Sequence, residues 1–294
     1  MDKKHIIHLF GTRTNCGMYF LQKASKFFKV QSYSRKKDTE NIKFDFDKNY
    51  NKKIFVENSI CVSFAPIWKF ANFLNKKYKH SKDELKNIKA VIVCSSSSAE
   101  TKKYTSNHFD KELNRLLLSS ENTIRKICNE LNIRFVIIRP TLIYGNFELF
   151  RDRNINTIIK ILKILPLIFL PNKTGLRQPI HFSQLADCVL VFCLNPEIID
   201  LQTTENLLSL GGDYEISYNE LILSIRRELV ISNKLNYFII IKLPNRIFNF
   251  ICAPLLLISP KLYDSLIRIS IDLAGFTKSS NFLNRKNKYF KFHA

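Results

Sequence analysis

Short apolar runs alternate with longer amphipathic stretches along the first half of the chain. The runs are rich in β-branched residues and predict strands over residues 5–10, 29–33, 60–65, 90–94 and 134–138. The stretches between them have helical length and predict helices over 17–27, 67–79 and 110–131. Strands that alternate with crossover helices are typical of an α/β fold, and we expect a doubly wound parallel sheet.

The pattern becomes less regular after residue 145, where a proline-punctuated apolar segment covers 155–171. We expect an α/β domain over residues 1–205, in which 146–176 is an excursion from the alternating pattern. The remaining residues, 206–294, are expected to form a smaller C-terminal region. No repeat and no low-complexity linker marks the boundary, so its position is set only by the change of pattern.

The net formal charge of +21 invites a nucleic-acid or anionic-membrane partner. The basic residues are spread along the whole chain, however, with no block of like charges and no zinc-finger or RNP-type motif. We therefore expect no nucleic-acid partner. The seven cysteines have no paired short spacing, which favours buried free thiols in a reducing cytoplasm over a disulfide framework or a metal site.

Two apolar segments bear on membrane contact. The first apolar stretch, within "MDKKHIIHLF", is too short for the apolar part of a signal peptide. The segment "NYFIIIKLPNRIFNFICAPLLLISP" is interrupted by Lys242, Pro244, Asn245 and Arg246, so no transmembrane helix is predicted. Lysines and aromatic residues alternate again in "RKNKYFKFHA". We expect a cytoplasmic protein, and peripheral contact with the inner face of the membrane stays open.

A glycine-framed loop follows the first predicted strand, in "HLFGTRTNCG". Gly11 permits a tight turn and Gly17 permits close packing of helix against strand, while the helix N-terminus can hold a pyrophosphate. Thr14 stands where a third glycine would let the ligand approach, and it either forces the ligand outward or supplies a hydroxyl. The alternative is a strand-turn-helix junction without a ligand. If a dinucleotide binds, the contacts are expected from Gly11, Thr12, Thr14, Asn15, Cys16 and Gly17.

Four further segments, in order, raise the weight of the dinucleotide interpretation. They are "VIVCSSSS" at 91–98, "FVIIRPTLIYGN" at 135–146, "GLRQPIHFSQLADCVLVFCLNPE" at 175–197 and "LSLGGDYEISYNEL" at 208–221. Together with the glycine loop they resemble the NAD-dependent epimerase/dehydratase family, the extended short-chain dehydrogenases. The resemblance implies that residues 1–205 form a Rossmann domain, that 146–176 extends toward the substrate site, and that 206–294 caps the substrate. It also implies a nicotinamide cofactor and, typically, a nucleotide-sugar substrate. It covers most of the chain.

In that family a Tyr-x-x-x-Lys helix carries out the redox chemistry. The tyrosine transfers the proton, and the lysine lowers the pKa of the tyrosine. If Glu121 is the acidic residue that usually follows the lysine, the two positions hold Leu113 and Leu117. Substitutes are expected in "SSSSAETKKY": Ser97 to orient the substrate hydroxyl, and Thr101, Lys102 or Tyr104 to transfer the proton. The alternative is that the serines only end a strand and the lysines are solvated.

The resemblance implies further contacts with the cofactor. Ser34 and Arg35 follow the second strand and favour the 2′-phosphate of NADP(H), while NAD(H) remains an alternative. Asp45 matches an acidic residue near the adenine, although a surface aspartate is nearly as good an interpretation. The other implied contacts are Phe46, Ala65, Pro66 and Pro140.

The resemblance also implies substrate contacts at Tyr144, Asn154, Arg177 and His181. Arg177 suits a substrate diphosphate, because a guanidinium can bind phosphate oxygens in pairs. His181 is also interpreted as a structural residue that positions the next helix. We expect an enzyme acting on a nucleotide-linked or lipid-linked sugar in surface polysaccharide synthesis, with a homodimer left open. The alternative is a catalytically silent NAD(P)H-binding sensor or scaffold, which the missing tyrosine and lysine favour.

Overall fold

A computed structural model of the chain describes residues 5–36, 41–105, 107–147, 153–165, 167–202, 205–231 and 239–283, without the side chains of residues 153, 154, 201 and 202. Its centre is an eight-stranded sheet in the order β14-β11-β6-β5-β4-β1-β2-β3, in which every pair is parallel. The strands are β1 (Ile6–Phe10), β2 (Lys29–Ser34), β3 (Ile42–Lys43), β4 (Ser59–Ser63), β5 (Ile88–Cys94), β6 (Arg134–Pro140), β11 (Leu207–Gly211) and β14 (Thr277–Lys278).

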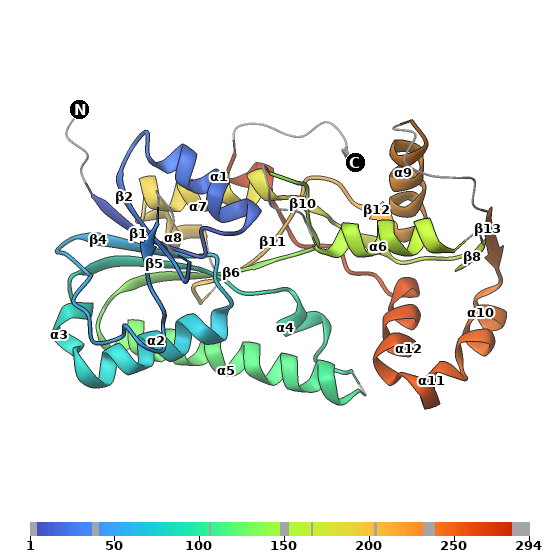
Figure 1. Cartoon of the computed structure of the whole chain (residues 1–294), viewed down its shortest axis with the longest axis horizontal. Helices are drawn as coiled ribbons and strands as arrows, with labels where there is room; N and C mark the ends of the chain where they lie inside the picture. The colour runs from blue at the N-terminus through green and yellow to red at the C-terminus, as the bar shows by residue number, and fades with distance from the viewer. Residues whose placement is uncertain are drawn as a thin grey trace.

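Helices cover both faces of this sheet (Figure 1). One face carries α1 (Asn15–Ala24), α7 (Phe182–Leu194) and α8 (Ile198–Gln202); the other carries α2 (Ile67–His80), α3 (Lys82–Leu85) and α5 (His108–Glu130). Each face buries its own apolar core against the strands. The central strands are consequently apolar on both sides, which explains their near-continuous runs of Ile, Val and Leu. The predicted α/β fold with a doubly wound parallel sheet is confirmed.

All five predicted strands have counterparts in the sheet, and the three predicted helices agree with α1, α2 and α5 to within a few residues. The sheet also continues past residue 205, because β11 and β14 both join its β6 edge. Residues 206–294 therefore contribute strands to the central sheet as well as forming the region beyond it. The last of these strands, β14, returns to the sheet from near the end of the described residues. The boundary at residue 205 stays a prediction.

A smaller region lies beyond the β6 edge, on the right in Figure 1. It has its own apolar core, to which α6, β8 and α9 contribute. Its elements are α6 (Arg153–Ile164), β8 (Leu167–Pro171), β9 (Leu176–Arg177), β12 (Ile216–Ser217), α9 (Tyr218–Ile231), β13 (Ile239–Leu243), α10 (Asn245–Cys252), α11 (Leu255–Ile258) and α12 (Pro260–Ile267). Parallel pairing joins β8 to β13, and antiparallel pairing joins β9 to β12.

Short elements connect the two regions. They are α4 (Ser98–Thr101), β7 (Ile143–Tyr144), β10 (Ile180–His181) and two 3-10 turns, Arg268–Ser270 and Ser279–Asn281. Within the described ranges, no helix combines the length and the apolar character needed to cross a membrane. The stretch 285–294, singled out above for its alternating lysines and aromatic residues, lies outside the described residues.

Candidate functional site

The chain order of the strands reverses between β1 and β4. From β1 the sheet runs through β2 to β3 on one side, and from β4 it runs through β5 to β6 on the other. Diverging connections at such a point leave a crevice beyond the carboxyl ends of the strands, where ligands of doubly wound sheets bind. The residues after β1 and β4 border this crevice, and Phe64 N–H donates to the Phe10 carbonyl across it at 2.9 Å.

The glycine loop, residues 11–17, closes this crevice with backbone contacts that admit no side chain. Gly11 has a φ of +81°, and a Cβ on it would lie 2.4 Å from Ala65 N. A Cβ on Gly17 would lie 2.3 Å from the Gly11 carbonyl oxygen and 2.9 Å from Thr12 Cα. The first glycine thus makes the tight turn, and the second lets α1 pack directly on the turn.

Thr14 begins α1 as its N-cap. Its Oγ1 accepts from Gly17 N–H at 3.0 Å and donates to the Gly11 carbonyl at 2.8 Å. The hydroxyl is therefore folded back over the loop, where it satisfies one of the N–H groups that a helix leaves free at its start. The loop has the turn and the close packing of a dinucleotide site, and it departs from one only in this side chain.

The other residues of the glycine loop support its shape. Thr12 is buried, and its Oγ1 lies 3.5 Å from the Tyr33 carbonyl of β2. Asn15 donates from Nδ2 to the Gly145 carbonyl at 2.8 Å, which ties the loop to the end of β7. Burial raises the pKa of the Cys16 thiol to about 12, so this cysteine remains a neutral packing residue.

The cofactor contacts expected near β2 fall into two groups. Ser34 is buried at the end of the strand and accepts from Lys36 N–H at 3.3 Å, while Arg35 is exposed beside it. Asp45 accepts from Asp47 N–H at 2.9 Å and so closes its own turn. Phe46 packs among the aromatic rings of Phe10, Phe44, Phe70 and Phe73. Ser34 and Arg35 thus lie at the strand end, whereas Asp45 and Phe46 follow β3 and are held by local contacts. Contact of these four residues with a cofactor stays a prediction.

Two of the remaining cofactor residues border the crevice. Ala65 is buried against Gly11, and the exposed Pro66 starts α2. Pro140 ends β6, where its carbonyl accepts from Ser97 N–H at 3.1 Å. The residues expected to touch the cofactor therefore follow β1, β2, β4 and β6, at one edge of the sheet.

At Leu113 and Leu117, the two positions where we expect the family's tyrosine and lysine, α5 is apolar. Leu117 is buried in the core between α5 and the sheet, and Leu113 packs at its margin. Glu121, one turn further, accepts from Ser95 Oγ at 2.5 Å and is bound by both branches of Arg139, from Nε at 3.0 Å and from Nη2 at 2.5 Å. This side of α5 packs the helix on β5 and β6 and offers no proton-transfer group.

The serine segment, residues 95–110, contains the four residues expected to replace that pair. Ser97 starts α4, and Thr101 ends it. Thr101 lines an open cavity of about 390 Å³ together with residues 271–277. Tyr104 is 90% exposed, with its ring beside the Lys103 ammonium. The fold brings Ser97 and Thr101 to the carboxyl edge of the sheet, but it turns the Tyr104 side chain to solvent.

Lys102 is held in an ion-pair cluster. Its Nζ donates to Asp110 Oδ1 at 2.5 Å, and Arg268 Nη1 donates to Asp110 Oδ2 at 2.6 Å. Asn107 Nδ2 also donates to Asp110 Oδ2, at 3.1 Å. Burial alone would raise the pKa of Asp110, but the hydrogen bonds from Lys102, Arg268 and Asn107 outweigh it and lower that pKa to about 2. The carboxylate is therefore charged, and it binds the ammonium that was expected to move a proton.

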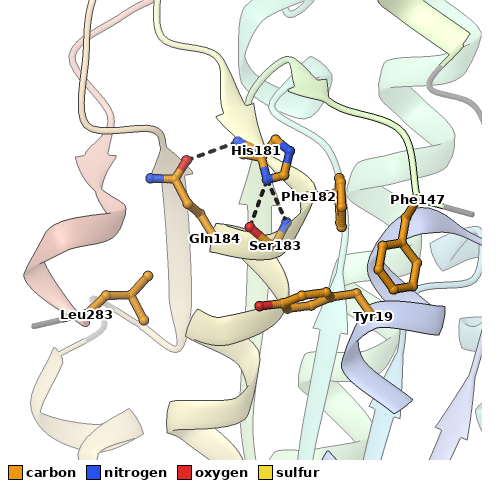
Figure 2. Close-up of a pocket in the computed structure, with 7 residues that line it drawn as sticks. All are labelled: Tyr19, Phe147, His181, Phe182, Ser183, Gln184 and Leu283. Atoms are coloured by element: carbon orange, nitrogen blue, oxygen red, sulfur yellow. Dashed lines mark hydrogen bonds between the residues drawn. The ribbon is translucent and has the colours of Figure 1, made fainter. Parts of the chain in front are cut away.

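Three of the expected substrate residues lie where the smaller region joins the sheet. Tyr144 and His181 are register partners of β7 and β10, with ring centroids 5.1 Å apart. His181 caps α7, as its structural interpretation predicted, through Nδ1 contacts with Ser183 and a Gln184 contact on its N–H. Figure 2 shows these contacts beside a pocket of about 260 Å³ that Tyr19, Phe147 and Phe182 also line. The side chain of Asn154 lies outside the described residues.

Arg177, expected to bind the substrate diphosphate, is buried and engaged by main-chain oxygens. Nη1 donates to the carbonyls of Leu176 and Ile271 at 2.7 Å each, and Nη2 donates to the Arg268 carbonyl at 2.6 Å. The guanidinium also lies over the Tyr218 ring, 5.3 Å from its centroid. Burial lowers the pKa of Arg177. In this structure the guanidinium fastens the C-terminal segment through three of its five N–H groups. A role in binding a substrate diphosphate stays a prediction.

Sequence reasoning missed the partners that fix the serine segment. Asn107 is the N-cap of α5 and accepts from Asp110 N–H at 2.8 Å. The Asn-x-x-Asp spacing of a helix start was the available signal for this pair. Nothing in the sequence pointed to Asp264 of α12, which binds Asn107, or to Arg268 of the following turn, which binds Asp110. Among the described residues, no group of three His, Cys, Asp or Glu side chains is arranged to hold a metal ion.

Comparisons with known proteins add a fold likeness. No family model matches the chain, and no curated protein matches it. A UDP-N-acetylglucosamine 4-epimerase from Bacillus cereus matches with 12% identity over 97% of this chain and 95% of that chain, at a TM-score of 0.61. A dTDP-glucose 4,6-dehydratase from Bacillus anthracis, in complex with NAD, matches with 11% identity over 97% and 92%, at 0.59.

A GDP-mannoheptose C4 reductase from Campylobacter jejuni with NADP bound is also similar, with 14% identity over 83% of this chain and 90% of that chain, at a TM-score of 0.58. All three are structures of the kind that the sequence resemblance implied. The likeness of fold expected from the sequence is therefore confirmed over most of the chain.

Proposed function

We propose that this chain binds a nicotinamide dinucleotide at the glycine loop and acts on a nucleotide-linked sugar. The observation that carries the proposal is the pair Gly11 and Gly17, which frames a backbone-lined turn at the point where the strand order reverses. The similar structures are those of a sugar-nucleotide epimerase, a dehydratase and a reductase, and they support this substrate class. The alternative substrate is a lipid-linked sugar in surface polysaccharide synthesis.

The end of β2 supports a preference for NADP(H) over NAD(H). The exposed guanidinium of Arg35 and the Ser34 hydroxyl stand where the second strand of such a fold meets the adenosine ribose. A guanidinium matches a 2′-phosphate in charge and geometry, whereas a carboxylate would be needed to bind the 2′-hydroxyl of NAD. Of the similar structures, one has NADP bound and another holds NAD, so they support the cofactor class more than the preference.

When bound, the cofactor supplies or accepts a hydride, and the chain must handle the proton. Leu113 and Leu117 cannot do so. Ser97 stands at the start of α4 beside Pro140 and is positioned to orient a substrate hydroxyl. Lys102 would have to leave its ion pair with Asp110 before its amine could reach a substrate.

A second function is favoured by the same contacts. Leucine stands at both expected catalytic positions, Tyr104 is exposed and Lys102 is paired with Asp110. These features favour a protein that binds a dinucleotide but does not catalyse a reaction. Such a protein would sense the reduced cofactor or hold a partner enzyme. The glycine loop is needed for either function, so dinucleotide binding is the common requirement.

Titration with NADPH and NADH, followed by nicotinamide fluorescence, tests that requirement. We expect saturable binding of the cofactor. UDP- or GDP-sugars should raise the affinity for the cofactor or slow its dissociation. Absence of binding to both cofactors would overturn the proposal. Oxidation of the bound cofactor by a 4-keto sugar nucleotide, or its reduction by a hydroxy sugar nucleotide, would assign the enzyme function. Binding without turnover across that panel would assign the silent one.

If turnover is found, Lys102→Met separates its two roles, with Lys111→Met as the control on an exposed lysine of α5. Loss of a general acid-base typically costs about 10²- to 10⁴-fold in rate. A loss of that size at unchanged cofactor affinity would assign proton transfer to Lys102. An unchanged rate would leave it as a partner of Asp110 only.

A further inference from the structure

Three helices of the smaller region form an apolar hairpin, residues 245–262, that projects from the body of the molecule. Figure 1 shows α10 and α12 as its two arms and α11 at the bend between them. Only Phe248 and Cys252 of this hairpin are buried apolar residues among those described. Its large apolar side chains that face solvent are Ile247, Phe250, Ile251, Leu256, Leu257, Ile258 and Leu262.

The degree of exposure at the bend is unusual. Phe250 is 81% exposed, Leu257 90% and Ile258 79%. Single exposed apolar residues are ordinary on protein surfaces, but a contiguous group of them marks a surface that is covered in use. The hairpin therefore needs an apolar partner to remove these side chains from water.

The charges of the hairpin identify the kind of partner. Residues 247–260 carry no charge, and the cations Arg246 and Lys261 stand at the two ends of this stretch, both exposed. No aspartate or glutamate lies between them. A span of the hydrocarbon core takes about 20 apolar residues, so this stretch is too short to cross a bilayer and suits its interface. Arg246 can then reach lipid phosphates directly. The Lys261 ammonium lies over the exposed Phe109 ring, 5.6 Å from its centroid, and reaches a phosphate by leaving that ring.

The opposite side of the hairpin is fastened to the Rossmann domain by polar groups. Asp264 accepts from Thr105 Oγ1 at 2.9 Å and from Asn107 Nδ2 at 2.5 Å. Arg268, directly after α12, binds Asp110. One carboxylate near the apolar stretch is thus directed toward the protein, where it does not repel an anionic surface. The exposed apolar side chains of α10, α11 and α12 remain in contact with solvent.

A second apolar face immediately precedes α10. In the parallel pair of β8 and β13, Leu167 is opposite Ile239 and Phe169 is opposite Ile241. Alternate residues of a strand point to the same face, and all four of these side chains are exposed. The exposed Lys242 follows, before α10 begins. The chain therefore presents apolar side chains with neighbouring cations from β13 through α12.

We propose that the apolar hairpin docks the protein on an anionic lipid bilayer, with α11 and the adjoining turns of α10 and α12 inserted at the interface. Arg246 and Lys261 lie at the headgroups, and the uncharged stretch between them replaces water with acyl chains. The proposal is independent of the dinucleotide site, because no residue of the glycine loop or of the serine segment enters the lipid.

Co-sedimentation of the full chain with vesicles tests this docking. We expect binding to vesicles of phosphatidylcholine mixed with phosphatidylglycerol and weaker binding to phosphatidylcholine alone. Leu257→Glu with Ile258→Glu should weaken binding to the mixed vesicles at least about 100-fold, since each buried apolar side chain contributes tenfold or more. Arg246→Gln and Lys261→Gln should each weaken it about fivefold, and only on anionic vesicles. Equal binding of wild type and the double glutamate variant would overturn the proposal.

A matched control carries the same charge change elsewhere. Phe27→Glu with Val56→Glu replaces two exposed apolar residues of the Rossmann domain and should leave vesicle binding within about twofold of wild type after its two added charges are allowed for. Near-native circular dichroism and an unchanged cofactor titration in each variant would show that folding is intact. A loss of vesicle binding in this control equal to that of the hairpin variant would also overturn the proposal.

Two further measurements distinguish the lipid from a second copy of the chain. Leu257→Trp adds a reporter to a chain whose only tryptophan is Trp68, in α2. We expect its emission to shift to the blue on mixed vesicles and to be quenched by brominated acyl chains. Sedimentation velocity without lipid should show the same oligomeric state for wild type and the double glutamate variant. A dimer that this variant dissociates, together with no vesicle binding, would assign the hairpin to self-association instead.

Discussion

The glycine loop and the serine segment follow strands β1 and β5 of the same sheet, yet they are held in different ways. In the glycine loop the fixed points are main-chain atoms, such as the Gly11 carbonyl that a Cβ on Gly17 would meet at 2.3 Å. In the serine segment the fixed point is the Asp110 carboxylate, bound by Lys102 and Arg268. A binding surface made of backbone survives wide sequence change, whereas proton-transfer chemistry depends on single side chains and their partners.

This difference bears on the proposal that the chain keeps a dinucleotide-binding turn while Leu113 and Leu117 stand at the positions of the family's tyrosine and lysine. Glycines at two positions suffice to keep the turn and the approach of α1, whatever the other side chains do. On α5, leucines can replace Tyr and Lys and still fill the core, because packing needs only volume and apolar character. The serine segment then becomes a place where the C-terminal region is fastened.

The largest effect is expected from Asp110→Asn, which removes the charge at the centre of the serine segment. The side chains of Asp110, Lys102 and Arg268 are 2%, 18% and 20% exposed, so the two cations would lose their partner in a mostly dry setting. Removing one member of a buried ion pair typically costs about 3–5 kcal/mol. Denaturant unfolding at neutral pH measures this loss. NADPH affinity should change less than about twofold, and a large loss of affinity would contradict the separation of the two regions.

The pH dependence of stability sharpens this prediction. The pKa of Asp110 is lowered from 3.8 to about 2 in the folded chain. A carboxylate with a depressed pKa contributes stability above its unfolded pKa, and this contribution is lost as the pH falls through the folded value. Wild type should therefore lose this part between pH 3.8 and about 2. The Asp110→Asn variant should have a flatter acid limb in unfolding experiments, and an identical limb would show that other carboxylates dominate.

The next effect is expected from Gly17→Ala in the glycine loop. Its Cβ would overlap the Gly11 oxygen and Thr12, both main chain, so the turn itself must shift. Overpacking of this kind costs about 1–3 kcal/mol of stability, and NADPH affinity should fall at least about tenfold because the loop no longer fits the ligand. Gly275→Ala is the control, since a Cβ there meets nothing within 4 Å. Its φ of +84° makes alanine strained, so this variant should also lose stability but keep its NADPH affinity. Unchanged affinity in Gly17→Ala would break the comparison.

The same difference decides how much could be predicted from the sequence. The sheet and the glycine loop follow from local signals: apolar runs of strand length, and glycines at a turn into a helix. Arg177 could not be placed, because its acceptors are the carbonyls of residues 176, 268 and 271, which only the fold brings together. Lys102 was expected to face a ligand, but its ammonium donates to Asp110, which is eight residues further along the chain and belongs to α5.

A smaller effect is expected from Arg35→Asp. The exposed guanidinium beside Ser34 favours a 2′-phosphate, and a carboxylate there would repel it and accept from a 2′-hydroxyl instead. We expect the ratio of NADPH to NADH affinities to change about tenfold in favour of NADH, which corresponds to one charge-assisted hydrogen bond. Competitive fluorescence titration measures the ratio. Lys43→Asp, on the neighbouring β3, should leave it nearly unchanged. A wild-type preference for NADH would show that Arg35 does not contact the cofactor.

The smallest effect, and the finest test of the glycine loop, is expected from Thr14→Gly. The Thr14 hydroxyl accepts a hydrogen bond from Gly17 N–H and donates one to the Gly11 carbonyl. An N-cap threonine replaced by glycine costs only a few tenths of a kcal/mol, so thermal unfolding should hardly move. The change frees an N–H group at the helix start and removes bulk from the place where a pyrophosphate would lie, so NADPH should bind more tightly, by less than about tenfold. Thr14→Ser keeps the hydroxyl and should match wild type. If Thr14→Gly binds NADPH more weakly than Thr14→Ser, the hydroxyl itself contacts the phosphate, and the threonine is part of the binding surface instead of a cap over it.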